Sequence, residues 1–206
     1  MFQIAVCHHH PVLHEDIGLG TLDVMENGGL LVTLLSAYGF DLVVHGHKHH
    51  PKLTYAQDSK PLPVLAAGSF AAGMKSGLAT RTRNVFHLID LSRQAFDSFT
   101  FGTIRTWQFQ HSRGWTPATC DAADFPHLTG FGCYERPETL ANAVLEQFHS
   151  IGQPVLPWSQ MLKRLPQLQF IPPAVFKALA DSLRTKAIEF SPPAPDLPSV
   201  IGVLSS

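Results

Sequence analysis

Histidine side chains gather in two short segments of the sequence, where they could bind metal ions. The first segment is the run His8-His9-His10, which Pro11 follows, and the second holds His45, His47, His49 and His50. Imidazole is the most common metal-ligating side chain in proteins, and it titrates near neutral pH. The sequence therefore predicts a metal site to which both segments contribute.

The order Gly46-His47-Lys48-His49 indicates how the second segment could present two ligands. In a loop that leaves a strand, residues two apart can face one centre while the residue between them points away. Gly46 has no side chain, so the backbone could approach that centre closely. In the first segment, Pro11 stiffens the turn after His9. The alternative interpretation is a polar loop with incidental histidines.

Each histidine segment follows a stretch that is typical of a buried strand. Residues 2–7 and 41–45 are short apolar runs, and leucines at helical spacing lie between them, ahead of Gly39. Glycine often ends a helix at this position. The pattern predicts a strand, a helix and a strand, with both histidine segments at one edge of a sheet.

The remainder of the chain predicts more strands and then helices. Strands are expected in an antiparallel meander over residues 53–56, 63–67, 85–91 and 96–109. Helices are expected over 138–150 and 174–190, followed by an extended proline-rich tail over 191–198. We therefore predict an α/β fold with two parts, residues 1–110 and a small, mostly helical segment over residues 111–206.

Composition narrows the functional classes. With 15 basic and 16 acidic residues and a formal net charge of −1, the chain shows no sign of a surface that coats nucleic acid. A phosphate substrate is still compatible, because a bound metal supplies local positive charge. The three scattered cysteines predict no disulfide framework. No segment reaches the roughly 18 apolar residues of a membrane helix, so we expect a cytoplasmic protein with no membrane partner.

Two stretches of the sequence resemble a known family. Residues 4–11, ending in His-His-His-Pro, and residues 41–51, with Gly-His-Lys-His, resemble the HHP and GHxH motifs of calcineurin-like metallophosphoesterases. The helix between them and the strand over residues 64–69 also look like that family. The resemblance covers roughly residues 1–110. It implies part of a layered β-sandwich flanked by helices and a phosphate mono- or diester as substrate.

The resemblance also implies roles for individual residues. His9 and His47 would bind one ion and His49 a second, although the register of the histidine run leaves His8 or His10 as alternatives to His9. Such sites hold two divalent ions (Mn, Fe or Zn) about 3.5–4 Å apart. Other side chains could orient the ligands or contact substrate, or simply be exposed: His8, His10, His45, His50, Arg81 and Arg83.

The sequence departs from this family in one large respect. The DxH, GD and GNHD/E motifs precede the HHP motif in the family, and no residues here match them. Three neutral imidazoles shared between two ions cannot hold both, so we expect weak metal binding and little turnover. We interpret the chain as a fragment, as a complementing subunit whose other half is a separate chain, or as a non-catalytic interaction module. Missing strands also predict an open sheet edge and exposed apolar surface.

Overall fold

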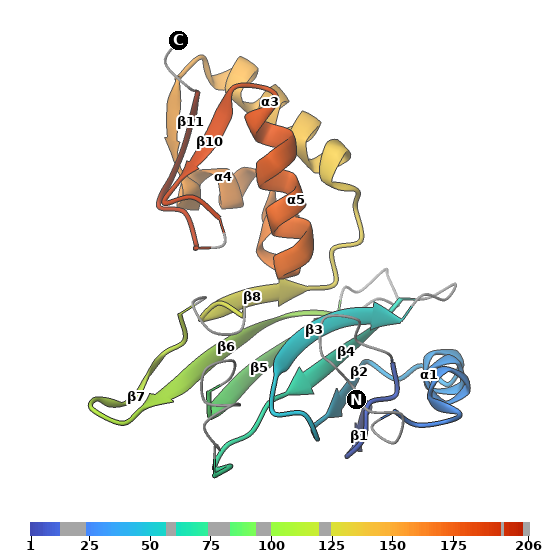
Figure 1. Ribbon diagram of the computed structural model, residues 1–206. Coiled ribbons are helices and arrows are strands. Elements are labelled where there is room, and N and C mark those ends of the chain that lie inside the picture. The colour runs from blue at the N-terminus through green and yellow to red at the C-terminus, as the bar shows by residue number, and fades with distance from the viewer. Residues whose placement is uncertain are drawn as a thin grey trace.

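The computed structural model describes residues 1–12, 24–56, 61–73, 83–93, 100–119, 125–194 and 196–203. Within these ranges the chain forms three sheets and four α-helices, which confirms the α/β class (Figure 1). In this described part, no helix has the length and apolar character needed to cross a membrane.

The first sheet carries both histidine segments. It contains β1 (Ile4–Cys7), β2 (Leu42–His45), β4 (Leu62–Ala67) and β3 (Pro51–Ala56), in the order β1-β2-β4-β3. β1, β2 and β4 are parallel, and β3 is antiparallel to β4. Helix α1 (Gly28–Ala37) lies between β1 and β2 in the chain, and Gly39, whose φ is 76°, follows its C-cap residue Tyr38. The predicted strand–helix–strand unit is therefore confirmed.

The second sheet packs against the first. It contains β5 (Val85–Arg93), β6 (Thr100–Gln110), β7 (Gly114–Pro117) and β8 (Leu128–Phe131), all joined through β6. The shared core is made of buried apolar side chains from both sheets: Leu42, Leu53, Leu65, Ile104, Phe125 and Phe131. The predicted strands thus belong to two sheets and not to one meander, because β4 also pairs with β2. The second sheet continues past residue 110, since β7 and β8 both pair with β6.

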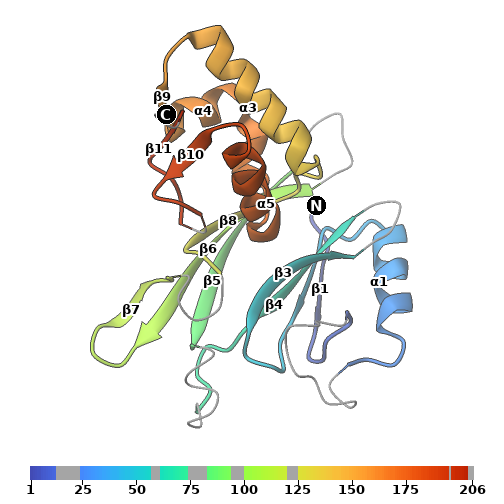
Figure 2. The same ribbon diagram turned by 45° about the horizontal axis from the view of Figure 1, so that its top comes forward.

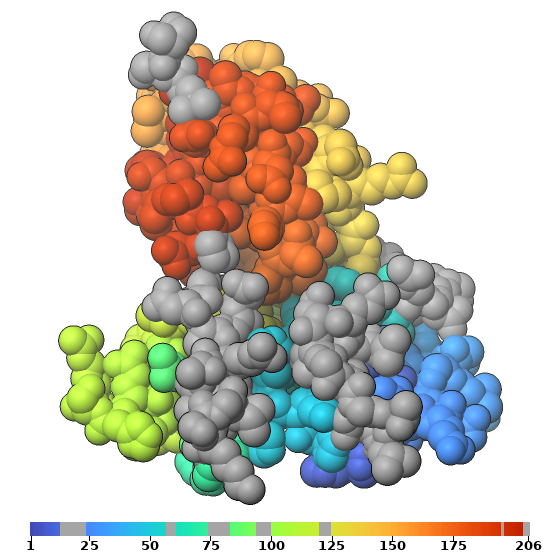
Figure 3. Space-filling view, in the orientation of Figure 1, coloured from blue at the N-terminus to red at the C-terminus, as the bar shows by residue number. Residues whose placement is uncertain are grey.

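A C-terminal unit follows with its own apolar core. It is built from α3 (Pro137–Ile151), β9 (Val155–Pro157), α4 (Trp158–Arg164), the 3-10 helix η1 (Pro166–Phe170), α5 (Pro173–Arg184), β10 (Ile188–Ser191) and β11 (Val200–Val203). The three strands form an antiparallel sheet in the order β10-β11-β9. The space-filling view shows this unit as a lobe above the two sheets (Figure 3).

Two sequence predictions fail in this unit. The helix expected over 174–190 ends at Arg184, because the chain turns through Ala187 at a φ of 58° and Ile188–Ser191 pairs as a strand. The expected extended tail instead leads into β11, which lies between β10 and β9. Alternating burial along β10 explains the strand, since Ile188 and Phe190 point into the core.

The C-terminal unit meets the second sheet by close backbone contact. A Cβ on Gly130 of β8 would lie 2.1 Å from the carbonyl oxygen of Gln169 in η1, so only glycine fits there. Next to this contact, the Cys133 N–H donates to the Phe170 carbonyl at 3.0 Å. Figure 2 shows the unit lying over β8 from a second direction.

The first strand is confirmed as β1, but the prediction that it is buried is wrong. Ile4 is 45% exposed and Val6 is 78% exposed. β1 pairs with β2 along one edge, and no described strand pairs with its other edge. The outer face of α1 is also apolar and exposed, with Leu30, Leu34 and Tyr38. This surface agrees with the open edge and exposed apolar surface predicted from the sequence.

Candidate metal site

Three imidazoles converge where β1 and β2 end. The possible ligand atoms of His8, His9 and His47 all lie within 4.8 Å of one another. Their ring centroids are 4.6 Å apart for His9 and His47, 4.8 Å for His8 and His9, and 4.9 Å for His8 and His47. Nδ1 of His47 and Nε2 of His8 share a hydrogen bond at 3.0 Å.

Parallel strand pairing explains why two distant segments meet. Cys7 is the register partner of His45, so the residues that follow both strands leave the sheet side by side. A hydrogen bond from the Gly46 N–H to the His8 carbonyl, at 3.2 Å, ties the two loops together directly after the strands. The predicted positioning of both histidine segments at one sheet edge is therefore confirmed.

The backbone of the second loop differs from the sequence-based expectation. A Cβ on Gly46 would lie 3.9 Å from the nearest atom, the His8 carbonyl oxygen, so the site does not require glycine there. The unusual residues are instead His47 and His49, with φ values of 80° and 57°. Non-glycine residues rarely adopt this left-handed conformation, and those that do are concentrated at functional sites. His47 therefore reaches the cluster from a backbone conformation that is unfavourable for a non-glycine residue.

The structure brings two of the three predicted ligands together. His9 and His47 belong to the cluster as predicted, but the third imidazole is that of His8 and not that of His49. His8 was expected to orient a ligand or contact substrate, and the alternative register of the histidine run is the signal that pointed to it. The role of His49 at a second ion stays a prediction.

Two further histidines lie beneath the cluster. His10 and His45 are 0% and 1% exposed, and their rings are 4.5 Å apart in a T-shaped contact. The His10 ring is also 6.4 Å from that of His47. Burial lowers the pKa of His45, and its contact with the Gly46 carbonyl offsets only part of that effect. These two rings form a packed, buried floor next to the cluster.

The other predicted residues that the structure describes, His50 and Arg83, are not members of this cluster. His50 is half-buried, and Arg83 is exposed. Arg81 falls outside the described residues. His87, which the sequence did not single out, contacts the Ala67 carbonyl at 3.0 Å and the Thr106 hydroxyl at 2.8 Å. It therefore links β4 to the second sheet and acts in packing.

The donor set fits one divalent cation and not two. Three imidazoles that leave a coordination position open are a common arrangement for Zn²⁺. Exposed His8 and His9 can rotate toward the distances of about 2.0–2.1 Å that Zn–N bonds need. The cluster contains no carboxylate that could bridge a second ion. Among the described residues, the candidate site therefore offers three imidazoles and no carboxylate.

Comparison with models of protein families and with curated proteins gives no match for this chain.

Proposed function

We propose that this chain provides the histidine side of a metal-dependent phosphoesterase site, which hydrolyses phosphate mono- or diesters. The observation that supports the proposal best is the convergence of His8, His9 and His47 from the ends of two adjacent parallel strands. The likeness of these segments to the HHP and GHxH motifs points to phosphate esters. A bound divalent cation would supply Lewis-acid polarisation of a phosphoryl oxygen. The three imidazoles would hold the cation, and the buried His10 ring lies next to that of His47, with ring centroids 6.4 Å apart.

By itself the chain is expected to bind metal weakly and to turn over little substrate. Three neutral imidazoles leave the charge of a divalent cation uncompensated, and the described cluster offers no carboxylate. Imidazole ligands suit Zn²⁺ and iron, whereas Mn²⁺ prefers oxygen donors. Full activity with manganese or with a metal pair therefore depends on oxygen ligands that come from elsewhere.

The exposed edge of β1 favours a second candidate, in which the chain is a complementing subunit. Ile4 and Val6 lie in the open at this edge, and His8 and His9 follow them directly. A parallel strand from a separate chain could pair with β1, which would cover the apolar edge. The carboxyl end of that strand would then arrive beside the imidazoles, where aspartate side chains could complete the ligand set.

Metal titration tests the site. Calorimetry with Zn²⁺ should give one site per chain, and His47→Ala should weaken it by at least about tenfold, the loss seen even when groups that only support a ligand are removed. His149→Ala is the matched control, because His149 is exposed on α3, in the C-terminal unit. Equal affinity of the two variants for Zn²⁺ would refute the assignment.

A second experiment tests the chemistry. Hydrolysis of an aryl phosphate is measured for the chain alone and for the chain joined to a segment that carries the DxH, GD and GNHD motifs. We expect low turnover from the chain alone and metal-dependent turnover from the joined protein, which His47→Ala abolishes. Turnover that persists in His47→Ala would contradict the phosphoesterase proposal. Binding of a partner that metal leaves unchanged would instead support a non-catalytic interaction module.

A further inference from the structure

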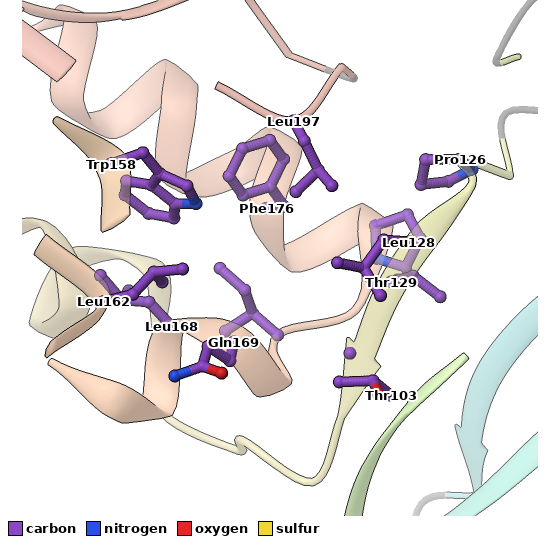
Figure 4. Close-up of a pocket in the computed structure, with 13 residues that line it drawn as sticks. Thr103, Pro126, Leu128, Thr129, Trp158, Leu162, Leu168, Gln169, Phe176 and Leu197 are labelled. Carbon is purple, nitrogen blue, oxygen red and sulfur yellow. The ribbon is translucent and has the colours of Figure 1, made fainter. Parts of the chain in front are cut away.

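A cavity lies where the C-terminal unit meets the second sheet, away from the histidines. Its volume is about 120 Å³, and its walls come from both parts of the molecule. Figure 4 shows Trp158, Phe176 and Leu197 on one side of the space and Thr103 on the other. Leu128 of β8 also lines the space.

The walls of this cavity are held in place by packing. Trp158 and Phe176 are 6% and 8% exposed, and both contact Phe190 behind them, with ring centroids 5.3 Å and 5.0 Å away. On the opposite side, the tight contact of Gly130 with the Gln169 carbonyl fixes the distance between β8 and η1. Neither wall can move inward freely, so the structure retains the space.

The lining selects a class of ligand. Leucine, proline and aromatic side chains dominate it, and Thr103 and Gln169 supply polar groups. None of the described residues that line it is charged. A charged ligand would lose its hydration without a partner. The volume is close to that of engineered apolar cavities of about 150 Å³, which bind benzene. Nucleotides and phosphorylated sugars are too large and too highly charged for it.

We propose that this cavity is a binding site for a small neutral aromatic molecule between benzene and phenol in size. Its ring would pack against Trp158 and Phe176 in edge-to-face or offset geometry. A hydroxyl group on the ring could bond with Thr103 or Gln169, since a few polar groups commonly fix orientation in apolar pockets. A bound ring touches both the sheet and the C-terminal unit, and therefore stabilises their contact. The site is independent of the metal-binding proposal.

Trp158 provides a direct measurement, because it lines the cavity. Replacing the other two tryptophans, in Trp107→Phe and Trp115→Phe, leaves Trp158 as the single indole. Toluene and phenol should each change its fluorescence along a saturating curve and raise Tm with concentration. Benzoate, the charged analogue, should do neither. A response that does not saturate, or equal responses to benzoate and phenol, would overturn the proposal.

Cavity-filling variants locate the site. Leu162→Phe places extra atoms in the space and should weaken toluene binding by about tenfold or more, as overfilling a packed site does. Leu145→Phe is the matched control, since Leu145 packs on the same core but does not line the cavity. Leu162→Ala enlarges the space and should favour propylbenzene over toluene, which keeps the test available if Leu162→Phe fails to fold. Equal toluene affinity in the Leu162→Phe and Leu145→Phe variants, or an unchanged preference in Leu162→Ala, would place binding elsewhere and refute the assignment.

Discussion

Asp41 joins the two sheets, and its replacement should be costly. Its side chain is fully buried and accepts hydrogen bonds from the Gln3 N–H at 2.7 Å, from Nη2 of Arg93 at 2.5 Å and from the Thr100 hydroxyl. Burial by itself raises the pKa of Asp41, but the bonds from Thr100, Gln3 and Arg93 outweigh it, and the pKa lies below its ordinary value. The carboxylate is therefore the charged centre of a network that joins Gln3, directly before β1, to β5 and β6.

The loss of unfolding free energy expected for Asp41→Asn can be worked out from these three bonds. Oδ1 of Asp41 accepts from Arg93 and Thr100, and Oδ2 accepts from the Gln3 N–H. An asparagine with its oxygen at the Oδ1 position therefore loses the bond to Gln3, and the other two bonds lose their charged acceptor. Hydrogen bonds to a charged group contribute about 1.5–3 kcal/mol each. The Arg93 side chain is 40% exposed, so water can replace its weakened bond to residue 41. This hydration reduces the loss of unfolding free energy. We therefore expect Asp41→Asn to lower the free energy of unfolding by about 3 kcal/mol, in line with other broken buried pairs.

Urea unfolding at pH 7, followed by circular dichroism, measures this loss. The matched control is Asp90→Asn, which breaks the ion pair that Asp90 forms with Arg105 at 3.0 Å. Those side chains are 62% and 47% exposed, and exposed pairs contribute about 0–1 kcal/mol. If Asp41→Asn costs no more than Asp90→Asn, the reasoning from burial and hydrogen bonding is refuted.

Further predictions concern pH and packing. The pKa of Asp41 is lower in the folded chain than in the unfolded chain. The carboxylate therefore contributes fully to the free energy of unfolding above the unfolded pKa of about 3.9, and this contribution is lost as the pH falls through the folded pKa. The difference in unfolding free energy between wild type and Asp41→Asn should accordingly shrink below about pH 4. Burial lowers the pKa of His87, and the hydrogen bond to the Ala67 carbonyl opposes this effect only in part. Urea titrations should therefore show the free energy of unfolding falling as the pH drops below about 6.5. The variant His87→Asn should make this fall less steep. Gly130→Ala should lower the free energy of unfolding by about 1–3 kcal/mol, because its Cβ overlaps the Gln169 carbonyl. Gly29→Ala, with no atom within 4 Å of the new Cβ, should leave the free energy of unfolding unchanged or raise it; equal losses for both alanine variants would contradict the packing argument.

Local signals in the sequence were sufficient for the strand–helix–strand unit. Short apolar runs define β1 and β2, and Gly39 ends α1 in a conformation that favours glycine. Burial was not predictable in the same way, since it depends on which neighbours a strand has. The end of α5 was also missed, because the turn at Ala187 uses a non-glycine residue at positive φ. β8 is short and contains Gly130. The close approach of η1 explains why a glycine stands there, and a contact between residues so far apart in the chain leaves no local signal.

For the candidate site, the sequence predicted the two loops but not the full set of imidazoles. Strand ends specify where the loops leave the sheet, and this is a local property. Which member of the histidine run faces the centre depends on the path taken after β1. The His10 carbonyl accepts a hydrogen bond from the Met25 N–H at 2.9 Å, and the His10 ring is buried against His45. That contact with a distant segment leaves His8 and His9 exposed to a ligand.

Two of the three clustered imidazoles, His8 and His9, follow β1, whose other edge is open, and this allows the two proposed roles of the chain to be distinguished. Val6 lies in the exposed edge, and His8 follows it by two residues. A partner that completes the ligand set must raise metal affinity, and by thermodynamic linkage metal must then raise partner affinity by the same factor. A partner that only covers apolar surface produces no such linkage. Titrating Zn²⁺ with and without a strand-donating partner therefore distinguishes a complementing subunit from an interaction module, and the effect should disappear in His47→Ala.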